Sequence, residues 1–535
     1  MGDREKRVGA LLRFSIAIVL ILFFHPQPCF SQNSKSISRS ASGTQKFIIN
    51  RIEVIGNTLL PSKDFEPLIA PAERRYVDLQ TLINIANQIT LLYFKKGYLL
   101  ARAFVPPQRI ENGVARIYVM EGRVGTISVE GNHYYPTSLI RAYILHSIKN
   151  GYFRYDEFQR SLLLLNELPD LQVKAVFRPG KDPGTSDLTL NVKDKNPVHE
   201  GLDYNNFGNR FVGVNRAGFE VWDSNFSKAG DLADVRGVFP FPSQQNPYLQ
   251  FEYNRPISDS GGRFGFTYAN ADIKAGQELQ PLDIRGTAAI YAFTFTQPIQ
   301  RTLTESSDIG GTFTSKNVNN FIFGSTLTSY DKVRELTGSY DHHWIAKNTQ
   351  DLVEVSGTQG LGTLFGGMPT NYSLASRPGA DDQFTRFNAD AVRILKFENG
   401  HFIIFRGEGQ LSFAALPITE QYSLGGPDSV RGYQQAELLG DSGWLLSAEY
   451  RIPFTVKYSP NPVQATFNLG TGDAFLQNPQ AGEFRDRHLT GFGVGLRTNL
   501  EENTSARIEL GFPLDPSSNS MNDTPVLYTQ FATQF

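Results

Sequence analysis

The 535-residue chain has one cysteine, Cys29, and almost no surplus of charge, with 51 basic against 53 acidic residues. A single cysteine excludes a disulfide framework. The balanced charge excludes a nucleic-acid binder held by bulk electrostatic attraction. Long apolar runs are also missing: after Phe24, no stretch approaches the roughly 18 to 20 residues that a membrane-spanning helix needs. Composition alone therefore predicts a soluble mature chain.

Residues 1–31 have the organisation of a secretory signal peptide. Basic residues precede a short apolar stretch at 14–24, and a polar break follows it. An uncleaved anchor helix is the alternative. Cleavage would remove Cys29 or leave it beside the cut, and a chain without thiols suits an oxidising compartment. Residues 32–46 are rich in Ser, Gln, Asn and Lys, and we expect a flexible lead-in there.

Residues 47–122 have the pattern of a small α/β module. Residues 47–55 alternate apolar with polar side chains and end at Gly56-Asn57, which predicts a strand and a turn. Asp78 is a suitable N-cap for a helix to Lys96, and strands are expected at 98–105 and 114–121. The apolar face expected for that helix comprises Leu82, Ile83, Ala86, Ile89 and Tyr93.

The same pattern then starts again. The segment TISVEGN at 126–132 resembles RIEVIGN at 51–57, and a helix near 156–167 with strands at 172–177 and 186–192 follows. A repeat of about 75 residues indicates two copies of one module, the second at 123–197. Neither copy contains paired groups that would suggest catalysis.

From residue 198 to the C-terminus, many stretches alternate strictly in polarity, which is typical of β-strands with one apolar face. Strands of such length exceed the usual five or six residues of soluble sheets, but match the roughly 9 to 11 that a tilted strand needs to cross a bilayer. Because each strand gives only alternate residues to lipid, low average hydropathy is no argument against a membrane barrel. The sixteen predicted strands are 199–207, 211–223, 231–241, 246–257, 261–273, 285–299, 306–318, 331–345, 349–361, 384–397, 401–412, 443–454, 462–475, 487–500, 503–514 and 525–535.

The connections between these strands differ in length in a regular way. Short ones follow even-numbered strands, at 258–260, 346–348, 398–400 and 501–502. The longest, 362–383 and 413–442, both follow odd-numbered strands. Short turns at one rim and long loops at the other are typical of an outer-membrane barrel, with a soluble sandwich as the alternative. The sequence thus predicts a mainly β chain, a 16-stranded antiparallel transmembrane β-barrel after two small α/β domains.

The last strand and one long loop contain distinctive residues. Leu527, Phe531 and Phe535 share one face of the final strand, and this pattern resembles the C-terminal assembly signal of outer-membrane barrels. Within 413–442, an arginine on a long loop is expected either to be solvated or to bind a carboxylate through forked hydrogen bonds. The loop residues of interest are Gly425, Gly426, Val430, Arg431, Gly432 and Tyr433.

These features together resemble a known family. IEVIGN at 52–57, VPPQ at 105–108 and MEG at 120–122 resemble a POTRA domain, and VRGY at 430–433 resembles the loop signature of two-partner-secretion transporters of the hemolysin secretion/activation type. The resemblance covers about residues 47–535. It implies two periplasmic POTRA domains that bind extended polypeptide, an outer-membrane barrel, and a loop folded back into the lumen.

The resemblance also implies an acidic partner for Arg431 on the barrel wall. The family has an Asp two residues before a Gly on the strand after the next turn, and Asn468 occupies that position here. Asn468 lacks the charge, so Asp473 from the strand end is the other candidate. Many transporters of this family carry an N-terminal plug helix, but residues 32–46 show no clear amphipathic pattern.

The expected function is capture of an unfolded partner exoprotein in the periplasm and its secretion through the barrel. The expected partners are that exoprotein, membrane lipid and the barrel-assembly machinery during biogenesis, with no nucleic acid, cofactor, metal or enzymatic activity. A barrel-assembly insertase is the alternative, followed by a passive porin. Gly440–Gly443 (GDSG) imitates a serine-protease site without a recognisable histidine motif. Gly491, Gly493 and Gly495 fit one face of a strand rather than a phosphate loop.

Overall fold

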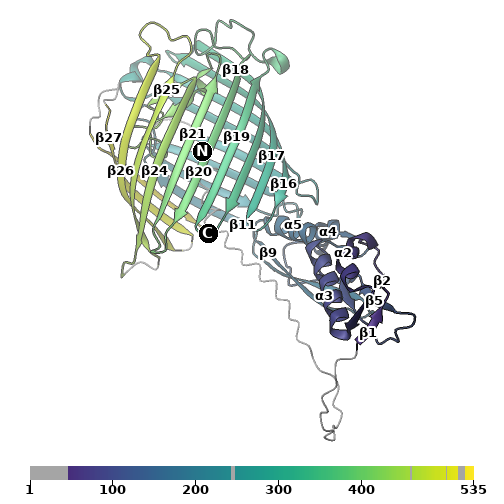
Figure 1. Cartoon of the computed structure of the whole chain (residues 1–535). Coiled ribbons are helices and arrows are strands. Elements are labelled where there is room, and N and C mark those ends of the chain that lie inside the picture. The colour runs from purple at the N-terminus through teal and green to yellow at the C-terminus, as the bar shows by residue number, and fades with distance from the viewer. Residues whose placement is uncertain (1–45, 242–246, 458–460, 502, 516–523) are drawn as a thin grey trace. The chain divides into compact units, whose positions relative to one another are not determined.

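The structure, a computed structural model, describes residues 46–241, 247–457, 461–501, 503–515 and 524–535 (Figure 1). The predicted signal peptide and all of the lead-in except Lys46 lie outside the described residues. The chain folds into two compact units that divide between Lys195 and Asn196.

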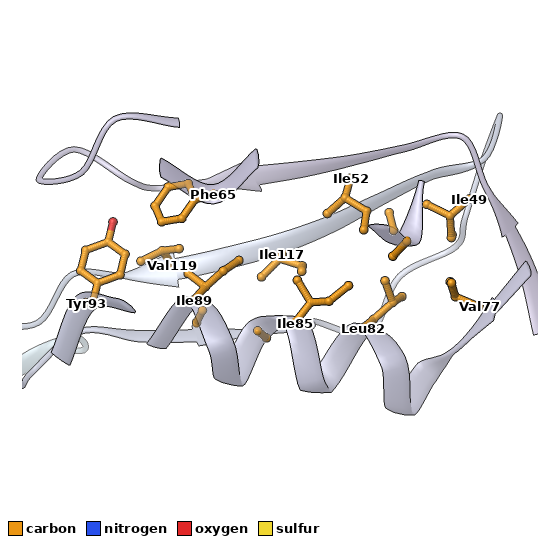
Figure 2. Packing of buried hydrophobic residues seen from close by; sticks show 14 of the residues in the cluster. Ile49, Ile52, Phe65, Val77, Leu82, Ile85, Ile89, Tyr93, Ile117 and Val119 are labelled. Carbon is orange, nitrogen blue, oxygen red and sulfur yellow. The ribbon is translucent and has the colours of Figure 1, made fainter. Parts of the chain in front are cut away.

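The first module of the N-terminal unit packs one long helix, α3, against a three-stranded sheet of order β2-β5-β4. As predicted, Asp78 caps α3, since its carboxylate accepts a hydrogen bond from the Thr81 amide at 2.8 Å. Figure 2 shows the helix residues directed toward the sheet residues Ile52 and Ile117. The elements are β1 (Lys46–Ile49), β2 (Arg51–Ile55), η1 (Ser62–Phe65), α2 (Glu66–Ile69), η2 (Ala70–Ala72), β3 (Arg75–Asp78), α3 (Leu79–Lys95), β4 (Arg102–Phe104) and β5 (Val114–Met120).

Three details of this module differ from the sequence prediction. The strand expected at 47–55 is broken at Asn50, because β1 pairs with β3 whereas β2 pairs with β5. The strand expected at 98–105 is reduced to β4. On α3, Ile85 is buried in the core and Ile83 is only half-buried, because the buried face of the helix is rotated toward Ile85 relative to the predicted face.

The second module repeats the plan with a sheet of order β6-β10-β9, in which β6 and β10 are parallel as β2 and β5 are. Its helix α4 was not predicted, although Ile140, Tyr143 and Ile144 have the spacing of one buried helical face. The elements are β6 (Arg123–Glu130), α4 (Thr137–His146), β7 (Ile148–Lys149), β8 (Tyr152–Phe153), α5 (Tyr155–Asn166), β9 (Leu171–Pro179) and β10 (Thr185–Asp194).

An acidic residue at the end of one strand fixes the same turn in both modules. Glu121 accepts hydrogen bonds from the amides of Thr58 and Leu59 at 2.7 and 2.8 Å. Asp194 accepts them from Tyr134 and Tyr135 at 2.7 and 2.9 Å. The repeated Gly-Asn turn of the sequence is therefore held by one shared device, a carboxylate that satisfies otherwise unpaired amides.

The hydrogen bonds to these two carboxylates also set their acidity. Burial would raise the pKa of Glu121, but hydrogen bonds from Thr58, Tyr93 and Leu59 outweigh burial and hold that pKa below its usual value. At Asp194, burial is likewise outweighed by the amides of Tyr135, Tyr134 and His133, which lower the pKa of the carboxyl. Both groups are therefore held in their charged form.

The C-terminal unit is a closed antiparallel barrel of sixteen strands, as predicted (Figure 1). The first strand, β11, pairs with the last, β28, and closes it. Large apolar side chains such as Leu446, Leu469 and Phe467 are exposed on the outer face, as the alternation requires. The strands are β11 (Val198–Asn205), β12 (Asn215–Asp223), β13 (Leu232–Phe241), β14 (Tyr248–Pro256), β15 (Arg263–Lys274), β16 (Arg285–Arg301), β17 (Glu305–Ile322), β18 (Thr326–Ile345), β19 (Thr349–Gly360), β20 (Thr385–Lys396), β21 (Phe402–Ser412), β24 (Ser442–Phe454), β25 (Val463–Phe475), β26 (Asp486–Glu501), β27 (Thr504–Pro513) and β28 (Val526–Gln534).

The connections of the barrel contain short elements of their own. These are η3 (Gln277–Leu282), η4 (Leu364–Gly366), η5 (Ile418–Glu420), β22 (Tyr422–Leu424) and β23 (Leu438–Gly440). The pairing of β22 with β23 makes a hairpin inside the predicted 413–442 loop, and the sequence did not indicate it. Among the described residues, none of the helices has both the length and the apolar character needed to cross a membrane.

On β28, the predicted common face is present, since Leu527, Phe531 and Phe535 are all exposed. Tyr528 lies on the other face and is buried.

Candidate functional site

The candidate site is the end of the β22–β23 hairpin, residues 425–433, which we call the tip. Gly425 and Gly426 have φ angles of +101° and +116°, a region that side-chain-bearing residues rarely adopt. The reversal is then closed by hydrogen bonds from the Gly426 amide to the Val430 carbonyl and from the Ser429 amide to the Gly426 carbonyl, both 3.1 Å. The Gly-Gly pair thus permits a compact turn that presents Val430 and Arg431.

Arg431 is buried and bridges two strands of the barrel wall. Its Nε donates to Glu509 on β27 at 2.8 Å, and its Nη2 donates to Glu449 on β24 at 3.0 Å. Its Nη1 donates to the carbonyl of Ser429 at 3.2 Å, within the tip. Charge-assisted hydrogen bonds of this kind are the strong ones in proteins, so the guanidinium ties the tip to the wall.

The prediction that Asn468 or Asp473 is the wall partner of Arg431 is therefore wrong. Asn468 is buried, but its Oδ1 accepts no hydrogen bond within the described residues. Directly opposite it on β24 stands Glu449, which supplies the charge that an amide lacks. Asp473 pairs with His488 at 2.9 Å instead. Residues 468 and 473 are separated by an odd number of positions along β25, so their side chains point to opposite faces of the strand.

The barrel wall and the tip are joined by ion pairs to which each contributes both acidic and basic side chains. Arg507 on β27 pairs with Asp428 of the tip at 3.0 Å and with Glu509 at 3.0 Å. Its Nη2 also donates to the carbonyl of Pro427 at 2.7 Å. Arg451 donates to Glu449 at 2.6 Å. Asp428 and Arg431, the acidic and the basic side chain of the tip, thus each pair with an opposite charge on the barrel wall. These pairs fix both the position and the orientation of the tip.

Sequence reasoning missed Asp428, Glu449, Arg507 and Glu509. A usable signal existed at 507 and 509, since two charged residues spaced by two on a predicted strand share a face. A charge pair on the lipid side would be costly, so that face must be the lumen.

Aromatic hydroxyls hold the end of the tip. The Tyr528 hydroxyl accepts a hydrogen bond from the Gly432 amide at 3.0 Å and donates to the Tyr433 carbonyl at 2.6 Å. The Tyr433 hydroxyl donates to the Thr490 carbonyl at 2.9 Å. The Tyr528 hydroxyl alone therefore satisfies both the Gly432 amide and the Tyr433 carbonyl.

Glycines of the wall make room for the tip. A Cβ at Gly491 would overlap the carbonyl oxygen of Arg431, and one at Gly511 would overlap the amide of Gly432. Gly491 and Gly493 lie on one face of β26, as their spacing predicted. Their absent side chains let the tip backbone lie directly on the wall.

The chemistry of this site is that of attachment. The contacts are ion pairs and hydrogen bonds to backbone, and no nucleophile is paired with a base among them. In the part of the chain that the structure describes, no group of three or more His, Cys, Asp or Glu side chains is placed to hold a metal ion.

Comparisons with known proteins agree with this architecture. A family model for the haemolysin secretion/activation protein ShlB/FhaC/HecB matches residues 184–498, and a ShlB-type POTRA model matches residues 47–122. The heme/hemopexin transporter protein HuxB of Haemophilus influenzae is 23% identical over 489 residues, covering 89% of this chain and 85% of HuxB.

Solved structures show the same fold. CdiB from Escherichia coli superposes with a TM-score of 0.77 at 21% identity, covering 94% of this chain and 93% of CdiB. BamA from Haemophilus ducreyi lacking POTRA domains 1–3 gives 0.53 at 14% identity, covering 91% and 100%. The chain belongs to the haemolysin secretion/activation family ShlB/FhaC/HecB and is an outer-membrane transporter of the two-partner-secretion kind, with its POTRA domains in the periplasm.

Proposed function

We propose that the two POTRA modules capture an unfolded partner exoprotein and that the barrel passes it outward past the tip. The observation that carries the role of the tip is the double ion pair of Arg431 with Glu449 and Glu509. A buried arginine is stable only while its carboxylates stay close, so this contact fixes where the tip lies across the lumen.

Capture by the modules is supported by their sheet edges. Within the described residues, β2 has a strand partner only on its β5 side, and β9 has one only on its β10 side. An edge strand offers backbone groups to which an extended chain can add, except here at Ile52 and Val173, whose amides already donate to Glu73 and Asn166 at 2.9 and 2.8 Å. The alternative is that the modules act only as spacers. No nucleotide-binding motif is present in the sequence, so binding in the periplasm and folding outside would have to drive transit.

Two further partners belong to this proposal. The exposed apolar outer face of the barrel, with Leu446 and Phe467, would contact membrane lipid. The exposed face of β28, with Leu527, Phe531 and Phe535, would be recognised by the barrel-assembly machinery during insertion.

The test is secretion of a candidate exoprotein encoded beside this gene, with Arg431→Ala. Release at the cell surface should fall, because the tip loses both wall contacts. Arg301→Ala is the matched control, since Arg301 pairs with Asp308 at 2.7 Å entirely within the wall. Release equal in both variants would overturn the role of the tip.

A second arm of this experiment tests the modules. Deletion of residues 47–196 should abolish release while the barrel still inserts, and release that continues would overturn capture. The insertase alternative is tested by measuring the assembly of other outer-membrane barrels in a strain that lacks this protein. Secretion predicts no assembly defect.

A further inference from the structure

We propose that Glu420 is a second positioning residue of the 413–442 loop, which holds its first arm, residues 413–424, independently of Arg431. The inference rests on the proposed function of the loop and concerns how that loop is held. Glu420 ends η5, and its side chain is fully buried although it lies on a connection between strands.

Two cations of the wall bind this carboxylate. Lys316 on β17 donates to the Glu420 Oε1 and Oε2 at 2.8 and 2.9 Å. Arg386 on β20 pairs with Oε2 at 2.9 Å and donates to the Glu420 carbonyl at 3.1 Å. Gln410 on β21 donates to the same carbonyl at 3.0 Å. Three wall strands therefore fix both the side chain and the backbone of one loop residue.

The charge balance gives the reason for this attachment. Glu335 on β18 also pairs with Lys316 and Arg386, at 2.9 and 3.2 Å. Among the directly ion-paired groups, the wall supplies two cations and one anion, and Glu420 makes this set neutral. An uncompensated buried charge is strongly unfavourable, so the wall favours the state in which the loop is docked.

A third contact closes the base of the loop. Asp441, buried between β23 and β24, accepts hydrogen bonds from Arg377 at 2.7 Å, from the Leu416 amide at 2.8 Å and from the Gln477 amide at 2.6 Å. The protease-like GDSG sequence is thus a structural element that ties three loops together. Leu416 packs beside it in an apolar cluster with Val333, Met368 and Phe384.

The two anchors of the loop hold different parts of the wall. Glu420 contacts β17 and β20, whereas Arg431 contacts β24 and β27. They share no ion-pair partner. Leu416 and Val430 belong to separate apolar clusters, whereas Tyr422 and Leu424 at the end of the first arm pack in the cluster of Val430. Loss of the Glu420 contacts should therefore loosen the segment around Leu416, whose amide keeps only its bond to Asp441, and leave the tip in place, whereas loss of Arg431 should do the opposite.

The test uses single cysteines labelled with a hydrophilic maleimide in the full chain carrying Cys29→Ser. Leu416→Cys reports on the first arm and Val430→Cys on the tip, since both side chains are fully buried. In the Glu420→Gln variant, the maleimide should label Leu416→Cys roughly tenfold faster than in the parent, because charge-assisted hydrogen bonds are lost. The labelling rate of Val430→Cys should be unchanged. Arg431→Ala should do the reverse.

Glu335→Gln is the matched control, because it removes one negative charge from the same set but leaves the loop carboxylate in place. Its Leu416→Cys should label at the parent rate. Equal labelling in Glu335→Gln and Glu420→Gln, or no change in Glu420→Gln, would overturn the proposal.

If Glu420→Gln does not fold, as judged by heat-modifiable mobility, the double variant Lys316→Met/Glu420→Gln replaces it. This variant leaves Arg386 paired with Glu335 and the wall neutral, and faster labelling of Leu416→Cys is again expected. Labelling needs no exoprotein, so a failure of secretion in the parent would overturn the proposed function and leave this result standing. If Glu420→Gln leaves the labelling rate of Leu416→Cys unchanged while secretion still depends on Arg431, only the role of Glu420 as a second anchor is overturned.

Discussion

Arg431 and Glu509 stand 78 residues apart in the chain, and the guanidinium Nε donates to the carboxylate at 2.8 Å in a buried position. Arg507 also uses this carboxylate, at 3.0 Å, so one acid compensates a cation of the tip and a cation of the wall.

Replacing Glu509 with Gln should therefore destabilise the docked tip more than a typical substitution. Arg431, Arg507 and Arg497 keep their charge and lose a shared partner. Leaving a buried charge uncompensated costs about 3 to 5 kcal/mol, which is an upper bound here because Glu449 and Asp428 remain. We expect secretion to fall and Val430→Cys to become accessible to maleimide. Glu398→Gln, in an exposed turn, is the control and should behave as the parent does.

The close approach of tip and wall makes a second prediction. Gly491→Ala places a methyl group where the Arg431 carbonyl lies, and such overpacking costs roughly 1 to 3 kcal/mol. The tip should shift and Val430→Cys should label faster. Gly338→Ala, on β18, meets no atom within 4 Å and serves as the control. Equal labelling in the two variants would argue against direct seating of the tip on β26.

Tyr528 tests the hydrogen bonds separately from the charges. Tyr528→Phe keeps the ring and removes the hydroxyl that the Gly432 amide and the Tyr433 carbonyl both use. Leaving these buried groups unpaired should cost about 1 to 3 kcal/mol, measured as a lower temperature of barrel unfolding in detergent. Tyr291→Phe, on the exposed outer face, should unfold at the parent temperature.

The barrel was predictable from the sequence because its signal is local and repeated. A period of two needs only neighbouring residues, and all sixteen predicted strands are present. The capped helix after Asp78 was predictable for the same reason. The break at Asn50 was not, since the two halves of that stretch pair with strands far along the chain.

The partners of Arg431 depend on which distant strands face the loop, and a single sequence does not encode this locally. The choice of Asp473 could nevertheless have been rejected from the sequence, because its spacing from Asn468 places it on the outer face. The buried Glu420 gave no signal, since nothing nearby in the chain pairs with it. Its partners Lys316 and Arg386 lie on strands β17 and β20.

The repeated turn carboxylates predict how the POTRA modules respond to acid. The pKa of Asp194 in the folded state lies below its usual 3.8, and that of Glu121 lies below its usual 4.5. A group with a depressed pKa contributes stability that is present above the unfolded pKa and is lost as pH falls through the folded value. Both modules should therefore lose stability below about pH 4. Hydrogen exchange of residues 46–195 in the full chain, corrected for intrinsic rates, measures this loss.

Asp194→Asn gives this prediction its control. At pH 7 the variant should expose its own turn, at His133–Tyr135, with a loss of roughly 1.5 to 3 kcal/mol, because the charged acceptor of three amides is gone. As pH falls through the lowered pKa of Asp194, the parent carboxyl becomes protonated and the two proteins should approach each other in stability. The first module, with Glu121 intact, should keep the parent response to pH. A difference between parent and variant that stays constant while the parent carboxyl is titrated would show that the charge of Asp194 does not stabilise the turn.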